Sequence, residues 1–460
     1  MRWVGPFDAD RDTSGALAVV MLVVTSALMA IDAGETVPVG ALLLALGFAA
    51  AAISPIGAAA YTLAVVPFAF HLHPLPGGSF SLLELGIVWT VGAIGIRLVL
   101  SPRQLPRRIA TAVTRYPWIT VAAAVLIVAA LASIRRLPPD AHHAEALREL
   151  RLVVLEPIAF VAALIILDIR RNGAAWLVGG LVAGGVVASA GALMQLFDAD
   201  AGVIADNVTR LTGPYSHPNN LSLYLERIAA FAVPFAIMLS GRRRVVIATS
   251  MGAMLLALVL TYSRGGWLGM AAALVVILVV LQRYRLLALM GVAGLVAAVP
   301  AGVLLRERIM DLGGASDEPT RFAIWRSSWD MILDHPWTGV GPDQFLYQYG
   351  RRYVEPIGWP ERYTSHPHNA ILDFAVRLGA GGLAALATMV GAVIAAAVSG
   401  FRELRSDPVR LGAFAALVAG AVHGMIDNSF FLPDLAVLFW TFLVLLSIAP
   451  DSTASSEVAA

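Results

Sequence analysis

Long apolar runs separated by short polar connections make up most of the chain. A bilayer core about 30 Å thick needs roughly 20 apolar residues in a spanning helix. Runs of this kind predict an all-α, polytopic transmembrane helix bundle of about 12–14 spans. The runs cover residues 14–31, 36–53, 56–72, 80–100, 117–134, 152–168, 174–197, 220–240, 245–262, 265–281, 286–305, 370–398, 411–427 and 434–449. The second and third runs are close enough to form a single hairpin.

One long polar segment, residues 306–367, interrupts this pattern. It separates a predicted bundle of spans 1–11 (residues 1–305) from spans 12–14 (368–450), and a disordered cytoplasmic tail is expected at 451–460. Within it, Pro319–Asp334 has helical periodicity and predicts an amphipathic helix at the membrane interface. Arg326 is expected to pair with Asp330 one turn later. The predicted apolar face consists of Phe322, Trp325, Trp329, Ile332 and Leu333.

Arginines in the short connections predict the orientation, because cytoplasmic loops retain positive charge. Clusters follow every second span from the fourth to the twelfth. This alternation places both termini in the cytoplasm and the 306–367 loop outside. The clustered residues are Arg103, Arg107, Arg108, Arg115, Arg170, Arg171, Arg242, Arg243, Arg244, Arg283, Arg285, Arg402, Arg405 and Arg410.

Composition supports a membrane protein and narrows the chemistry. Of 460 residues, 58% are hydrophobic and 14% are charged, which is too few charges to cover a water-facing surface. The net charge of +1 gives no sign of nucleic-acid binding. Cysteine is absent, and all 32 basic residues are arginine, so thiol catalysis, thiolate metal sites and lysine nucleophiles are excluded.

The strongest candidate for catalysis is Thr364–Asn369, which ends the long loop. A neutral imidazole at His368 is suited to accept a proton near neutral pH. His366 lies two residues earlier, and Asn369 opens the next span. A solvated helix start capped by Asn369 is an equally good interpretation of the spacing. A His-x-His pair can also bind a metal, but no third ligand has suitable spacing, so no metal is expected.

Two further motifs lie at the predicted outer membrane boundary. Tyr262–Trp267 holds Arg264 beside two glycines that allow close backbone approach to a ligand. Arg210 opens the loop before the eighth span, and His217 is interpreted as stabilising a turn. A guanidinium suits phosphate oxygens, although Arg264 in a tight turn also fits a snorkelling side chain.

Charged pairs inside spans are often functional. Asp373 with Arg377, and His423 with Asp427, are each one helical turn apart and are interpreted mainly as ion pairs between helices. His423–Asp427 also fits a proton relay. The triplets Asp8-Ala-Asp10 and Asp198-Ala-Asp200 fit a divalent metal only weakly. A separate set, Arg210, Arg264, Arg321 and His368, lies at one predicted membrane level and favours a lipid-phosphate substrate met at the outer surface.

Several of these motifs together resemble the O-antigen ligase and polymerase superfamily. His368-Asn369, nine residues and Gly379 are similar to its His-Asn-x9-Gly signature. Arg210-Leu-Thr-Gly, Ser263-Arg-Gly-Gly-Trp and His335–Pro342 occur in the family's order. The resemblance covers about residues 205–385. One departure is Arg377, where many relatives carry glutamate.

The resemblance implies an inverting, metal-independent glycosyltransferase of the bacterial inner membrane that uses an undecaprenyl-pyrophosphate-linked glycan and no cofactor. By position, His368 would be the general base, and Arg264 and Arg321 would bind the leaving pyrophosphate. Arg210 would be a third phosphate ligand, and His366 and Asn369 would orient the base or the acceptor. The expected partners are the donor, an acceptor glycan or glycolipid and the lipid bilayer, and nucleic acid is excluded.

Several alternatives stay open at this point. The acceptor is a core glycolipid, another carrier-linked repeat or a protein hydroxyl, with the first two favoured jointly. A proton-coupled transporter would use His423–Asp427 or Glu84. A metal-dependent polyprenyl-monophosphate-sugar transferase would use Asp198 and Asp200.

Overall fold

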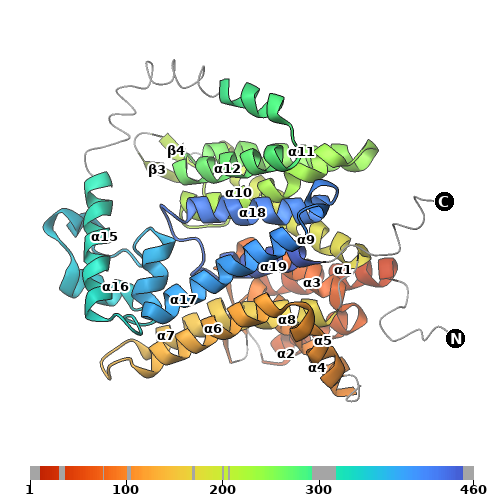
Figure 1. The fold of residues 1–460 in the computed structure, drawn as a ribbon. Coiled ribbons are helices and arrows are strands. Elements are labelled where there is room, and N and C mark those ends of the chain that lie inside the picture. The colour runs from red at the N-terminus through yellow and green to blue at the C-terminus, as the bar shows by residue number, and fades with distance from the viewer. Residues whose placement is uncertain are drawn as a thin grey trace.

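The protein is an all-α polytopic bundle whose helices run side by side (Figure 1). The computed structural model describes residues 11–30, 37–75, 77–100, 105–167, 171–198, 201–205, 208–292 and 317–448. Within these ranges, seven helices are long and apolar enough to cross a membrane. They are α1 (Arg11–Ala30), α4 (Leu82–Leu100), α6 (Pro117–Arg135), α9 (Arg171–Met194), α10 (Pro218–Met238), α11 (Gly241–Leu260) and α17 (Ala370–Ser399).

Other predicted runs form shorter or broken helices. The pair α2 (Val37–Ile53) and α3 (Pro55–Ala64) bends by 120°. Helix α3 begins anew after Ser54, because the Ser54 hydroxyl caps it by accepting from Gly57 N and a proline follows at the first helical position. The predicted 152–168 run is the π-helical η2 (Leu150–Leu155) with α8 (Glu156–Ile166). The remaining short apolar helices are α12 (Arg264–Val280), α18 (Pro408–His423) and α19 (Pro433–Ser447).

The rest of the described chain consists of connecting elements and two hairpins. Residues 284–292 are also helical. The connecting helices are η1 (Val66–Phe68), α5 (Leu105–Arg115), α7 (His143–Glu149), η3 (Gln195–Phe197), α16 (Phe345–Gln348), η4 (Tyr349–Tyr353), η5 (Pro356–Glu361) and η6 (Glu403–Arg405). The antiparallel hairpins pair β1 (Leu72–Leu75) with β2 (Gly78–Ser81) and β3 (Val203–Ala205) with β4 (Val208–Arg210).

Every predicted run inside the described ranges contains a helix, which confirms the fold class. The run at 286–305 is described only to residue 292. The predicted division at 305, the tail at 451–460 and the Asp8-Ala-Asp10 triplet lie outside the described residues, as does Asp200 of the second triplet.

Helix α10 is the most deeply buried span, and it contacts α9, α11, α12 and α18. Glycines on α12 allow close packing at this point. A β-carbon on Gly265 would overlap the His423 ring of α18, and one on Gly266 would overlap the Ser222 hydroxyl of α10. These glycines therefore allow close helix packing.

Helix α15 (Asp317–Asp334) lies across one end of the bundle, nearly perpendicular to its helices (Figure 1). We call this end the α15 end. The predicted helix is therefore present. On its predicted apolar face, Phe322, Trp329 and Leu333 are exposed, whereas Trp325 is half-buried against the protein. The face packed on the protein combines the small Ala323, Ser327 and Ser328 with the larger Ile324 and Met331.

A docked loop and a kinked helix fix the chain next to α15. Gly379 in α17 has φ 61° and ψ −145°, a conformation almost restricted to glycine. The kink admits residues 335–342: Ala380 N donates to Pro336 O at 2.8 Å, and Val340 N donates to Val376 O at 2.8 Å. A β-carbon on Gly339 would overlap Val376 O, and one on Gly379 would overlap the Trp337 backbone. Two of the noted motifs thus pack directly on each other.

Candidate active site

The segment from Thr364 to Asn369 enters α17 at the α15 end. Asn369 is the N-cap, and its side-chain oxygen accepts from Leu372 N at 3.1 Å. Its amide nitrogen donates to Met425 O at 2.9 Å, which ties the segment to the loop after α18. His368 has φ 53°, an uncommon backbone conformation for a residue other than glycine. Trp325 of α15 donates to Pro367 O at 2.9 Å and so fixes the turn between the histidines.

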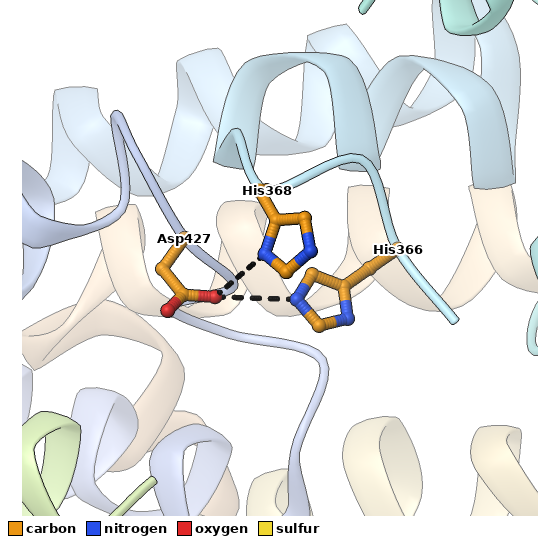
Figure 2. Close-up of side chains that lie close together, drawn as sticks. All are labelled: His366, His368 and Asp427. Carbon is orange, nitrogen blue, oxygen red and sulfur yellow. Dashed lines mark hydrogen bonds and ion pairs between the residues drawn. The ribbon is translucent and has the colours of Figure 1, made fainter. Parts of the chain in front are cut away.

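Asp427, in the loop between α18 and α19, is the centre of the site. Figure 2 shows both imidazoles directed at the same carboxylate. Its Oδ1 lies 3.2 Å from His366 Nε2 and 3.2 Å from His368 Nδ1, and it accepts from Asn428 N at 2.8 Å. Its Oδ2 accepts from Asn219 Nδ2 at 3.0 Å. Asp427 therefore joins three separate parts of the chain.

The carboxylate determines which imidazole nitrogens carry protons. Burial acts to raise the pKa of Asp427, but hydrogen bonds from His366 and His368 outweigh it and hold that pKa well below its usual range. An ionised carboxylate only accepts hydrogen bonds. The ring nitrogens facing it are then the protonated ones, so His368 Nε2 is left with a lone pair.

Two hydroxyls lie against the remaining ring nitrogens. Thr364 Oγ1 is 3.1 Å from His366 O and 3.3 Å from His368 Nε2. Ser365 Oγ is 3.1 Å from His366 Nδ1. When the single Thr364 proton points at the His366 carbonyl, Nε2 remains free to take a proton. A proton that arrives on Nε2 can then be donated to Thr364 Oγ1.

The buried Arg377 holds the Thr364–Asn369 segment through a hydrogen bond to its backbone. Its guanidinium donates to Asp373 at 2.7 Å, to Glu149 at 2.5 Å and to Ser365 O at 3.1 Å. The predicted Asp373–Arg377 pair is therefore present, and Glu149 is a second carboxylate partner. Arg377, the predicted departure from the family's pattern, thus bonds to two carboxylates and one backbone carbonyl.

Three predicted phosphate-binding arginines come from elements around the two histidines. Arg210 donates to Thr261 O at 2.8 Å and to Asn219 Oδ1 at 3.0 Å, so it connects the turn before Arg264 to the Asp427 network. Arg264 is the exposed first residue of α12. Arg321 is half-buried on α15, one turn before Trp325.

Other predicted polar residues have structural partners. His217 caps α10, with its Nδ1 accepting from Asn219 N at 3.2 Å, as expected for a turn residue. Burial lowers the pKa of His217, and the nearby Arg210 lowers it further, which keeps the ring neutral. Glu84 pairs with Arg151 at 2.8 Å. Arg326 pairs with Glu355 at 3.3 Å rather than with the predicted Asp330.

The predicted His423–Asp427 pair is present, with His423 Nε2 4.0 Å from Asp427 Oδ2. Helix α18 ends at His423, so Asp427 belongs to the following loop and is not one turn along the same helix. His423 Nδ1 also bonds to Glu226 at 2.8 Å. The sequence spacing indicated no third metal ligand for the His-x-His pair, but Asp427 lies close enough to be one.

Comparison with known families gives one match. Residues 249–387 match the family model described as O-antigen ligase. This part of the chain is therefore similar to the O-antigen ligase family. No curated protein matches the sequence.

The O-antigen ligase match covers part of the site. It includes Arg264, Arg321 and His368, together with Gly379, whereas Arg210 and Asp427 lie outside it. At the level of the family, the match supports a membrane glycosyltransferase of the O-antigen ligase or polymerase type that acts on lipid-linked glycans. With the apolar helices, it also supports a multi-pass membrane protein.

Proposed function

We propose that this O-antigen ligase family member transfers a glycan from an undecaprenyl-pyrophosphate carrier to an acceptor hydroxyl, with inversion and without a metal. The α15 end would face outward from the bacterial inner membrane, with both termini in the cytoplasm. The observation that carries the proposal is the Asp427–His368 pair, whose Nδ1–Oδ1 distance is 3.2 Å.

His368 would act as the general base. With Nδ1–H held on Asp427, Nε2 takes the proton of the acceptor hydroxyl as its oxygen attacks the anomeric carbon. The carbon–oxygen bond to pyrophosphate breaks on the opposite face, and its electron pair leaves with the pyrophosphate. Asp427 stabilises the resulting imidazolium, and Thr364 Oγ1 can accept its Nε2–H. Proton transfer of this kind contributes about 10²–10⁴ in rate.

Arg264 and Arg321 would bind the leaving pyrophosphate, with Arg210 as a third ligand. A pyrophosphate already leaves readily once its developing charge is met by guanidinium groups, so stabilisation of that charge is the remaining requirement. His366 and Asn369 would orient the base. Support comes from their contacts: His366 shares Asp427 with His368, and Asn369 fixes the start of α17.

The acceptor is proposed at the level of a glycan or glycolipid hydroxyl, which covers ligation and polymerisation. In this proposal, the motifs that match the family would surround the donor phosphates and the base. They provide no feature that selects one acceptor.

The test is release of undecaprenyl pyrophosphate from a lipid-linked glycan by purified protein in EDTA. We expect release by the wild type and loss of about 10²–10⁴ in rate for His368→Ala. His143→Ala is the matched control, because His143 is an exposed histidine elsewhere in the structure. Equal release by His368→Ala and wild type would remove His368 from this role. No release by folded wild type with several acceptors would contradict the function itself.

A further inference from the structure

We propose that His366, His368 and Asp427 also form a binding site for a divalent transition-metal ion such as Zn²⁺, and that the bound ion inhibits transfer. The inhibitory part rests on the proposed base function of His368, whereas the binding part rests on geometry alone.

Two of the three distances between the ligand atoms are already close to those of a tetrahedral site. With metal–ligand bonds of about 2.0–2.1 Å, two tetrahedral ligands are about 3.3 Å apart. Both histidine nitrogens lie 3.2 Å from Asp427 Oδ1, and all three atoms lie within 4.8 Å of one another. The histidine side chains retain 19% and 22% exposure, so an ion has access and water can fill the fourth position.

Each ligand also has the outer partner that a metal site requires. A metal-bound histidine usually donates its other N–H to an oxygen, which fixes the ring orientation. Ser365 Oγ is 3.1 Å from His366 Nδ1, and Thr364 Oγ1 is 3.3 Å from His368 Nε2. The Asp427 carboxylate is held by Asn219 and by the Asn428 backbone. Imidazole and carboxylate ligands suit Zn²⁺.

Metal binding would change the tautomer of the base. An ion on His368 Nδ1 requires a lone pair there, so the ring proton moves to Nε2 and is donated to Thr364. The nitrogen that would accept the acceptor's proton is then occupied, and the neutral rings release no proton overall. The same three residues therefore act either as an oriented base or as a metal site.

The direct test is titration of the EDTA-treated full-length protein with Co²⁺, followed by the visible absorption of tetrahedral cobalt. The chain has no cysteine, so thiolates cannot produce the band. We expect a band that is lost in His366→Gln and kept in His143→Gln. Loss of an outer partner typically costs 10–100-fold in metal affinity, so Ser365→Ala should weaken binding by about that factor. No tetrahedral band, or an equal band in His366→Gln, would overturn the site.

The inhibitory role is tested on carrier release with Zn²⁺, using Mg²⁺ at the same concentration as the control. Mg²⁺ prefers an all-oxygen octahedral shell and should leave release unchanged. We expect Zn²⁺ to suppress release and EDTA to restore it. Release that rises with Zn²⁺, or stays constant while the cobalt band forms, would overturn inhibition. Absence of release in EDTA would contradict the proposed function instead, and the cobalt titration would still decide the site.

Discussion

Asp427→Asn tests the central contact of the site with almost no change in shape. In the wild type, the carboxylate accepts from His368 Nδ1 at 3.2 Å, from His366 Nε2 at 3.2 Å and from Asn219 at 3.0 Å. The amide removes the negative charge and offers an NH₂ group to one of these donors. If that group faces His368, the ring must accept at Nδ1 and carry its proton on Nε2, which removes the base.

The expected loss can be estimated from the role of that proton transfer. General base catalysis contributes about 10²–10⁴ in rate, which corresponds to about 2.7–5.4 kcal/mol in activation free energy at 1.36 kcal/mol per tenfold change. We expect kcat for carrier release to fall by about this range in Asp427→Asn, with little change in folding. Residues that act as a unit lose activity non-additively. The double variant Asp427→Asn/His368→Ala should therefore be within about threefold of His368→Ala alone.

The assay is initial-rate release of undecaprenyl pyrophosphate in EDTA, with thermal unfolding measured in the same detergent. Asp343→Asn is the matched control, since Asp343 is a half-buried aspartate that pairs with Arg148 at 3.6 Å outside this network. A loss below about threefold in Asp427→Asn would refute the base-orienting role. A multiplicative loss in the double variant would show that Asp427 acts independently of His368.

Three further predictions follow from the described contacts. Arg264→Lys and Arg321→Lys should each reduce kcat by about 10²–10³, because an ammonium cannot replace the guanidinium fork on a pyrophosphate; an equal loss in the exposed Arg351→Lys would contradict this. Gly379→Ala should destabilise the protein by about 1–3 kcal/mol from backbone strain alone, with further loss from overlap with the docked loop, and an unchanged unfolding midpoint would refute that. Arg377→Met should lower the free energy of unfolding by about 3–5 kcal/mol, because it leaves the buried carboxylates of Asp373 and Glu149 unpaired. An unfolding experiment that shows no such decrease would contradict this.

The helices were predictable because their signals are local. Apolar runs and 3.6-residue periodicity depend on neighbours in sequence, and the helix predicted at Pro319–Asp334 was found at Asp317–Asp334. The face of that helix that packs on the protein was not predictable, because it combines small residues with Ile324 and Met331 and depends on contacts with segments distant in the sequence.

The partner of the base was not predictable for a different reason. Asp427 lies 59 residues after His368, and its spacing from His423 suggested a single continuous helix. The helix ends at His423 instead, followed by Gly424, whose carbonyl accepts from Ala370 N at the start of α17. The available signal was Gly424 itself, since glycine is frequent just beyond helix ends.

Several of the sequence motifs contribute hydrogen bonds that hold the segment carrying His368. His368 is held by irregular segments, and such segments keep their shape only when their backbone groups are bonded elsewhere. Asn369 bonds to Met425 O, Trp325 bonds to Pro367 O, and Arg377 bonds to Ser365 O. Each bond fixes the histidine segment to a different neighbour: the Asp427 loop, α15 and the kinked part of α17.

The kink at Gly379 also affects the position of His368, the proposed base, although it lies eleven residues away. It admits the 335–342 loop, which places the C-terminal end of α15 against α17, and α15 in turn holds Pro367 between the two histidines. Arg321 is on the same helix, so its position relative to His368, the proposed base, depends on the same docking. Any substitution that fills the kink should therefore change the geometry between His368 and Arg321 as well as stability. A Gly379→Ala protein that remains folded but has lost activity would reveal this coupling, and retained activity at the same expression and folding would exclude it.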